Sequence, residues 1–214
     1  MKLILCCLGM WIVFFRLLAQ DSGHNFPYLF DEFQDCLIVY KNGRQFTAPV
    51  NYHLIQKHFV FMDSEEKEFS NPEQIAVLRI GNRSFLLDRQ SAIEVIQVDP
   101  KFNVIYSGDI RKAPKETSYG GTTQTASVDT YSGLGGGNGL ISGKQNDNRI
   151  VTGINKTYEV KIGKKTKQFY NKKSFLKLFP DDKQDQLNEY IEKNQIDFNS
   201  VNQVLKLFNF SLSE

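Results

Sequence analysis

Cysteine is scarce in this chain, with three residues among 214. Cys6 and Cys7 lie in an N-terminal apolar run, and if that run is removed only Cys36 remains. One thiol cannot form an internal disulfide, so the remaining chain of about 195 residues depends on its hydrophobic core, and it is long enough to build one. Cys36 opens the apolar stretch CLIVY, which favours a buried, unreactive side chain over a nucleophile.

Histidine is equally rare, with three residues in the chain. His53 and His58 are five residues apart, so a single strand would hold them on opposite faces. This spacing argues against a shared metal ion. The acidic segment 63–68 lacks the alternating oxygen ligands and the glycine of a calcium loop, and it is interpreted as a solvated turn. No metal or other cofactor is therefore expected.

The glycine-rich stretch near residue 140 lacks the residues of a phosphate-binding loop. Gly143-Lys144 would end such a loop, but Asn138 stands where its first glycine belongs and Gln145 where a magnesium-binding Ser or Thr is required. The dinucleotide-binding pattern fails at the same place, because its third glycine would also fall at Asn138. Nucleotide binding is therefore not expected.

The N-terminal apolar run is too short for a membrane-spanning helix. Met1-Lys2 precede an apolar segment at 3–15, and the small residue Ala19 follows. A spanning helix needs roughly 20 apolar residues, whereas a charged start, a short apolar centre and a small residue are typical of an export signal. Residues 1–20 are therefore predicted to be a signal peptide. An uncleaved anchor is the alternative, because Arg16 and Leu17 fit a cleavage site poorly.

Two tight-turn pairs predict β-hairpins. Gly81-Asn82 joins two apolar runs, and a two-residue turn there places Ile80 opposite Arg83 and Leu78 opposite Phe85. Asn42-Gly43 gives a second hairpin on the same reasoning. Its predicted register has these pairs: Val39 with Phe46 and Leu37 with Ala48 on the apolar face, and Tyr40 with Gln45 and Ile38 with Thr47 on the polar face.

Further short strands and turn signals over residues 24–111 predict a mainly β or α+β chain, with an antiparallel β-meander in the form of an open roll, a small barrel or a sandwich. Residues 112–149 are rich in Gly, Ser and Thr and are interpreted as a flexible linker. Residues 150–214 are predicted to form a small unit of one β-hairpin and three short helices. The expected helix N-caps are Asn171, Asp181 or Asp182, and Asn199 or Ser200.

The chain contains the runs EFQDCLIVYKNGRQFTAPVNY, FVFMD, NPEQIAVLRIGNRSF and YGGTT, and its C-terminal part reads NKKSFLKLFPDDKQDQLNEYIEKNQIDF. Together these runs resemble a family of uncharacterised exported proteins of Bacteroidetes bacteria, from which Cys36 departs because the pattern has glycine there. The resemblance covers most of the chain after the signal. It implies a periplasmic or outer-membrane-associated location in a Gram-negative envelope, and it offers no catalytic residue.

Positive charge is concentrated near the C-terminal hairpin. Eight lysines and a single acid, Glu159, fall between Lys156 and Lys177. One interpretation is that these lysines are solvated and keep the edge of the sheet soluble. The other interpretation is that they form a binding site for an anionic partner. The candidate binding residues are Lys161, Lys164, Lys165, Lys167, Lys172, Lys173 and Lys177.

Two functions from different classes remain open. The favoured one is a non-catalytic exported envelope protein, an interaction module whose candidate partners are an envelope protein or an anionic envelope glycan or lipopolysaccharide, with peripheral membrane contact as an option. The alternative is a glycan-binding protein or hydrolase acting on envelope or dietary polysaccharide, with a site built from the aromatics at 26–33 and unpaired carboxylates. Neither an enzyme nor a nucleic-acid partner is expected.

Overall fold

The computed structural model describes residues 27–88, 91–112, 115–116, 122–123 and 149–213. The predicted signal peptide, residues 1–20, lies outside the described residues, and so does most of the predicted linker at 112–149. Within that linker, β9 (Lys115–Glu116) pairs antiparallel with β10 (Thr122–Thr123).

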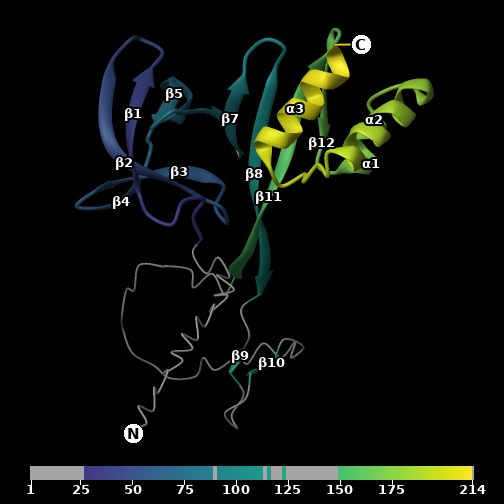
Figure 1. Ribbon diagram of the computed structural model, residues 1–214. Helices are drawn as coiled ribbons and strands as arrows, with labels where there is room; N and C mark the ends of the chain where they lie inside the picture. Colours follow the sequence, from purple (N-terminus) through teal and green to yellow (C-terminus); the bar gives the residue numbers. More distant parts are fainter. Residues whose placement is uncertain (1–26, 89–90, 113–114, 117–121, 124–148, 214) are drawn as a thin grey trace, which may run out of the picture.

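The main body is one antiparallel sheet of ten strands, in the order β12-β11-β8-β7-β6-β5-β1-β2-β3-β4 (Figure 1). The sheet is open, and the mainly β, antiparallel fold predicted from the sequence is confirmed. The strands are β1 (Gln34–Tyr40), β2 (Gln45–His53), β3 (His58–Asp63), β4 (Glu65–Glu68), β5 (Ile75–Ile80), β6 (Arg83–Asp88), β7 (Ser91–Gln97), β8 (Phe102–Lys112), β11 (Arg149–Ile162) and β12 (Lys165–Phe169).

Two meanders share this sheet. One runs from β1 to β4 and the other from β5 through β8 to β12, and they join where β5 pairs with β1. Strand β11 pairs with β8 from Arg149 opposite Lys112 to Val160 opposite Phe102. The C-terminal hairpin therefore continues the same sheet as the earlier strands.

The predicted register is confirmed at the β5–β6 hairpin, where Ile80 lies opposite Arg83 and Leu78 opposite Phe85. Gly81 sits at the turn with φ +57°, a left-handed conformation that glycine adopts at little cost.

The predicted β1–β2 register is wrong by one residue. Ile38 lies opposite Phe46, and Val39 lies opposite Gln45. The loop has three residues instead of two, because the Tyr40 amide donates to the Arg44 carbonyl at 2.9 Å and Gly43 takes φ +83°. A shift of one residue exchanges the two faces of a strand, so Ile38 is buried in place of the predicted Val39.

One face of the sheet, called here the core face, carries a continuous row of buried side chains across seven strands. Each member lies directly opposite the next in the strand pairing, so all point to the same side. The row consists of Ile38, Leu78, Phe85, Glu94, Val104, Tyr158 and Phe169.

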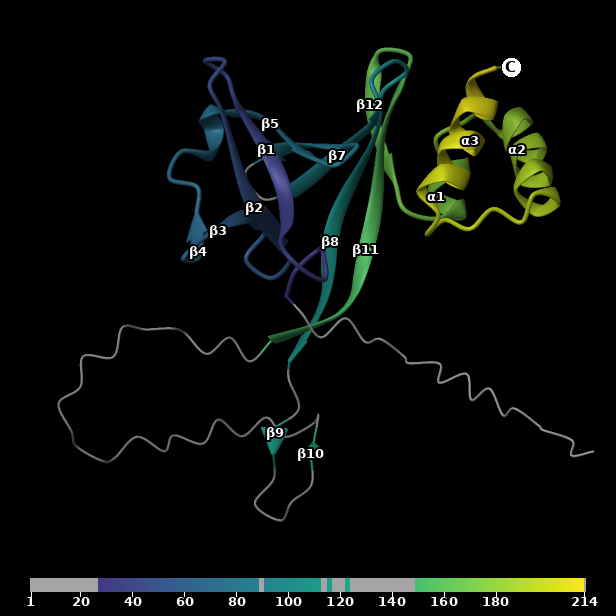
Figure 2. The same cartoon turned by 60° about the vertical axis from the view of Figure 1, so that its left-hand side comes forward.

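The β1–β7 half of the core face is covered by the curl of the sheet itself, which brings β2 and β3 across from β7, β8 and β11 (Figures 1 and 2). The rings of Phe59 and Phe85 lie 5.8 Å apart between centroids. Gly108 of β8 lies close to Leu54, which follows β2. A Cβ added to Gly108 would lie 3.2 Å from the Cβ of Leu54, so this close approach favours glycine.

Three helices cover the other half, at β8, β11 and β12 (Figure 2). They are α1 (Lys172–Leu176), α2 (Asp181–Lys193) and α3 (Val201–Leu212). Phe175 of α1 contacts Phe169 with a centroid distance of 4.9 Å, and Phe208 of α3 lies 5.5 Å from Phe102. A short 3-10 helix, η1 (Pro72–Gln74), precedes β5.

The helix caps agree only in part with the prediction. Asn171 caps α1 by accepting a hydrogen bond from the Ser174 amide at 2.9 Å, as predicted. The N-cap of α2 is Pro180, so the prediction of Asp181 or Asp182 is wrong. Both residues lie in the first turn of the helix, where their carboxylates interact favourably with the positive end of the helix dipole. Ser200 holds the cap position of α3 without a side-chain hydrogen bond. Among the described residues, no helix has the length and apolar character needed to cross a membrane.

Candidate functional site

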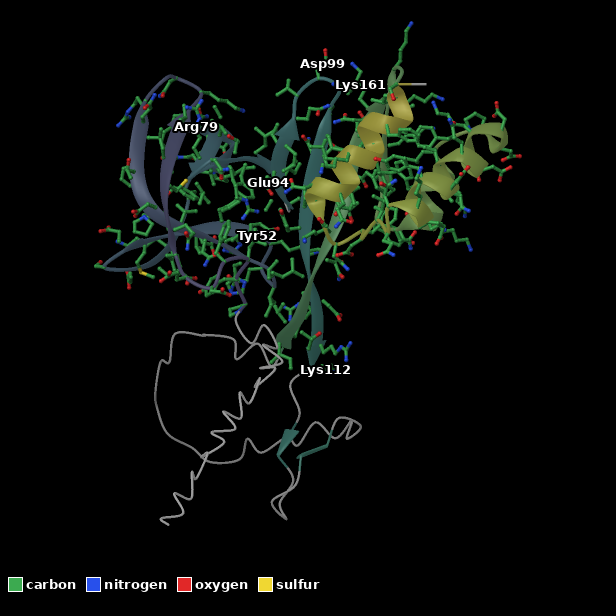
Figure 3. The ribbon with its side chains drawn as sticks, viewed as in Figure 1. Tyr52, Arg79, Glu94, Asp99, Lys112 and Lys161 are labelled. Carbon is green, nitrogen blue, oxygen red and sulfur yellow. The ribbon has the colours of Figure 1, made fainter. Side chains whose placement is uncertain are left out.

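Three of the candidate lysines gather at the β11–β12 turn. Lys161, Lys164 and Lys165, the tip lysines, surround Gly163 and are exposed to solvent. None of them has an ion pair or side-chain hydrogen bond within the described part of the chain. The Lys161 amide donates to the Lys101 carbonyl at 3.2 Å, which brings the β7–β8 turn with Asp99 next to the tip (Figure 3).

The other candidate lysines divide into two groups. Lys167 donates from Nζ to the Leu178 carbonyl at 2.9 Å, and Lys172 pairs with Glu192 of α2 at 2.5 Å, so both serve contacts within the fold. Lys173 and Lys177, the helix lysines, are exposed at α1 and have no such partner among the described residues. The tip lysines lie at the first end of β12, which begins at Lys165, and the helix lysines follow its other end.

Glu159, the single acid of this lysine-rich stretch, does not compensate the tip lysines. Its carboxylate pairs with Lys101 at 2.6 Å and accepts hydrogen bonds from Asn103 and Gln168. Burial raises the pKa of Glu159, but the Lys101 ammonium outweighs it and holds the pKa below its usual range. The tip therefore carries excess positive charge.

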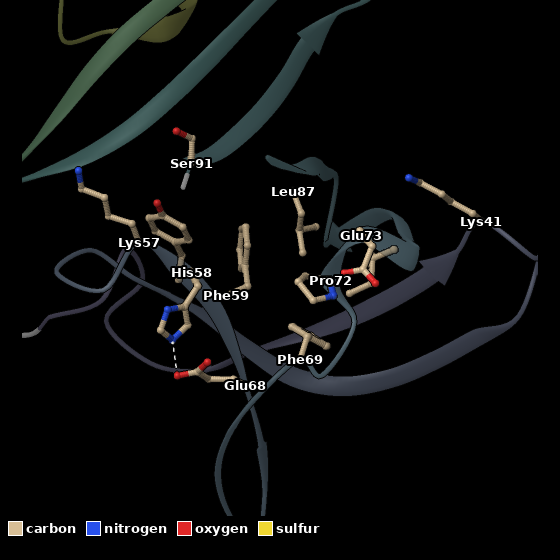
Figure 4. Close-up of a pocket in the computed structure, with 12 residues that line it drawn as sticks. Lys41, Lys57, His58, Phe59, Glu68, Phe69, Pro72, Glu73, Leu87 and Ser91 are labelled. Atoms are coloured by element: carbon tan, nitrogen blue, oxygen red, sulfur yellow. Dashed lines mark ion pairs between the residues drawn. The ribbon is translucent and has the colours of Figure 1, made fainter. Parts of the chain in front are cut away.

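A second candidate site is a groove of about 580 Å³ between β3, β4, η1, β5 and β6 (Figure 4). Its volume falls within the roughly 300–1,000 Å³ range of small-molecule sites. No short motif predicts this groove, because its residues are spread along the chain from Lys41 to Ser91. The groove is lined by Lys41, Tyr52, Lys57, His58, Phe59, Glu68, Phe69, Pro72, Glu73, Ile75, Leu87 and Ser91.

The floor of the groove is apolar and firmly packed. Tyr52 and Phe59 face each other across β2 and β3 with ring centroids 5.0 Å apart, and both are almost fully buried. Burial raises the pKa of Tyr52 to about 12, although a hydrogen bond from the Ala92 backbone opposes the rise. The Tyr52 hydroxyl therefore stays protonated at neutral pH and does not act as a base.

The rim of the groove carries unpaired charge. Lys41 and Lys57 stand at its two ends, and neither has an ion pair or side-chain hydrogen bond within the described residues (Figure 4). Glu68 lies 3.3 Å from His58 Nε2 as an ion pair when the imidazole is protonated. Figure 4 shows Glu68 directed toward His58, with Phe69 and Pro72 between it and Glu73.

A polar cluster lies in the β1–β7 half of the core face, next to the groove. Arg83 donates to both carboxylate oxygens of Glu94, at 2.7 and 2.9 Å, and Tyr106 donates to Glu94 at 2.5 Å. The guanidinium lies 4.9 Å from the Phe85 ring centroid. Burial lowers the pKa of Arg83, but Glu94 and Tyr106 outweigh it and hold the pKa above its usual range. Every charge here has a partner, so the cluster is a structural ion pair.

The aromatic residues at 26–33 are used within the fold. Phe26 lies outside the described residues. The ring of Phe30 packs edge-on against Phe85 at 6.0 Å, and Tyr28 contacts His53 at 5.1 Å and donates its hydroxyl to Glu66. The ring of Phe33 lies 5.5 Å from that of Tyr28, and all three rings are half-buried.

Among the described residues no group of three or more His, Cys, Asp or Glu side chains could hold a metal ion. Cys36 is fully buried, and burial raises the pKa of its thiol to about 11. Comparison of the chain with protein-family models, with curated proteins and with solved structures finds no match.

Proposed function

We propose that the protein is a non-catalytic exported envelope protein that works as an interaction module, with the tip lysines and helix lysines binding an anionic envelope glycan or lipopolysaccharide. The observation that carries this proposal is that these five lysines are exposed and lack ion-pair partners within the described residues. An envelope protein with an acidic surface would satisfy the same lysines.

The expected strength follows from the position of these charges. Each lysine near an anionic surface contributes about 1 kcal/mol, and exposed charges are screened by salt. The three tip lysines together are therefore worth about a hundredfold in binding, and the two helix lysines about tenfold or more. Because the two groups lie at opposite ends of β12, an extended polyanion engages both more readily than a small anion does.

Co-sedimentation with Bacteroidetes envelopes tests the proposal. The mature protein is expected to pellet with envelopes at low salt and to stay in the supernatant at about 0.5 M salt. Changing the tip lysines together to Gln (K161Q/K164Q/K165Q) should abolish most binding, and changing the helix lysines (K173Q/K177Q) should weaken it.

A matched control removes three exposed cations elsewhere, Arg44, Lys112 and Lys193, by the same change to Gln. This variant has the same net charge as the tip variant and should bind as the native protein does. Equal loss in the two variants would show attraction by net charge alone, and binding unaffected by the tip variant would overturn the proposal.

A further inference from the structure

The groove has two rim lysines, Lys41 and Lys57, without an ion-pair partner among the described residues, and it is separate from the proposed lysine surface. We propose that this groove binds a long-chain carboxylate, with the acyl chain on the apolar floor and the carboxylate at Lys57. This inference does not rest on the proposed function.

The floor fits an aliphatic chain better than a sugar. Phe59 and Tyr52 are 4% and 2% exposed, so they offer little open ring face to a ligand. A sugar ring stacks on an open aromatic face, whereas an acyl chain gains free energy by covering any apolar surface. Leu87, Ile75 and Pro72 continue this apolar surface along the groove.

The head-group end is set by charge. In Figure 4 the Lys57 ammonium and Ser91 lie on one side of the groove, and Glu68 lies on the other beside His58. The Ser91 hydroxyl, like the Lys57 ammonium, has no hydrogen-bond partner within the described residues. An ammonium or a hydroxyl on this side can donate to a carboxylate, and the charged ammonium is the stronger donor.

The backbone at Lys57 takes a conformation that is uncommon for a residue with a side chain. Lys57 takes φ +62°, a left-handed conformation that costs a non-glycine residue roughly 1 kcal/mol. Its amide donates to the His53 carbonyl at 2.7 Å, which holds the turn. Glycine would adopt this conformation at a lower cost in free energy. The turn nevertheless carries a lysine, and this lysine lines the groove.

Isothermal titration with three twelve-carbon probes tests the proposal on the mature protein, below the micelle concentration of each probe. Dodecanoate is expected to bind with one-to-one stoichiometry, about tenfold more tightly than dodecan-1-ol and more tightly still than dodecylammonium. Equal affinity for the three head groups, the absence of saturable binding, or binding of soluble oligosaccharides instead would overturn it.

Two substitutions at one position separate ligand binding from folding. Lys57→Gln and Lys57→Gly should each weaken dodecanoate binding five- to tenfold and leave dodecan-1-ol binding unchanged. Lys57→Gly should also raise the midpoint of thermal unfolding, which shows that the loss of binding is not a loss of fold. Unchanged dodecanoate affinity in both variants would overturn the assignment of the head group to Lys57.

The helix-lysine variant K173Q/K177Q is a control that removes one more positive charge than the Lys57 variants do. It removes two exposed ammonium groups at a distance from the groove, so dodecanoate should bind to it as to the native protein. Conversely, Lys57→Gly should still pellet with envelopes. The two proposals can therefore fail independently, and loss of dodecanoate binding in K173Q/K177Q would show that the probe binds the lysine surface and not the groove.

Discussion

The two halves of the core face are built on one sheet but are covered in different ways. In the half at β8, β11 and β12 the three helices leave Phe169, Phe175 and Phe208 fully buried. In the half from β1 to β7 the sheet covers itself, and a groove of about 580 Å³ with the half-buried Phe69 and Leu87 remains at its side. A helix can shift along a sheet until its side chains fill the space, whereas a strand is fixed by its hydrogen-bonded neighbours.

This difference suggests a division of roles. The helix-covered half supplies close packing, which stabilises the chain through buried apolar area. The self-covered half combines a partly buried ion pair, Arg83 with Glu94, and an open groove with charged residues of both signs at its rim. The groove is an incompletely filled surface, and it is where the proposed carboxylate would bind.

The largest loss of stability is expected from a substitution that disrupts the packing of the helix-covered half. Phe208→Ala should lower the free energy of unfolding by about 3–5 kcal/mol, because the ring is fully buried against Phe102 and its removal leaves a cavity. The matched change in the groove half, Phe69→Ala, should cost about 1 kcal/mol or less, since that ring is partly solvated already. Urea unfolding followed by circular dichroism measures both. Similar losses would show that the two halves are equally packed.

The next effect concerns the buried ion pair. Arg83→Met should destabilise the protein by about 2–3 kcal/mol, because it leaves the Glu94 carboxylate, 5% exposed, with Tyr106 as its remaining partner. The double change Arg83→Met with Glu94→Leu removes both charges and should recover much of this loss. The same urea titrations apply. A double variant as unstable as Arg83→Met would indicate that the site depends on shape and not on charge.

The hairpins show how far sequence reasoning reaches. Gly81-Asn82 allowed the β5–β6 register to be predicted correctly, because the flanking apolar residues left one consistent pairing. Asn42-Gly43 is compatible with both two- and three-residue loops, and the choice moved Ile38 to the core face in place of Val39. Local turn chemistry thus predicts that a hairpin forms more reliably than it predicts which face is buried.

The candidate sites were predictable to different degrees. The high density of lysines was visible in the sequence. Which of them are used within the fold was not, because Lys167 bonds to the Leu178 carbonyl and Lys172 to Glu192 only in the folded chain. The groove was not predictable at all. It depends on the pairing of β5 with β1, which brings η1 and β6 beside β3 and β4, and no short motif encodes such a long-range arrangement.

The smallest predicted effect concerns Glu159, which lies behind the helix-covered half, on the face of the sheet opposite the core face. The pKa of Glu159 is held below its usual range against Lys101, so this pair stabilises the fold above pH about 4.3 and loses its contribution as the pH falls through the folded pKa. Glu159→Gln should therefore cost about 0.5–1 kcal/mol at pH 6 and little at pH 2.5.

Glu73→Gln is the matched control at the rim of the groove, since Glu73 is exposed and has no ion pair among the described residues. Its unfolding free energy should follow that of the native protein at both pH values. Urea unfolding at pH 6 and pH 2.5 measures all three proteins. A constant difference between Glu159→Gln and the native protein would mean that the Lys101 pair adds nothing beyond packing.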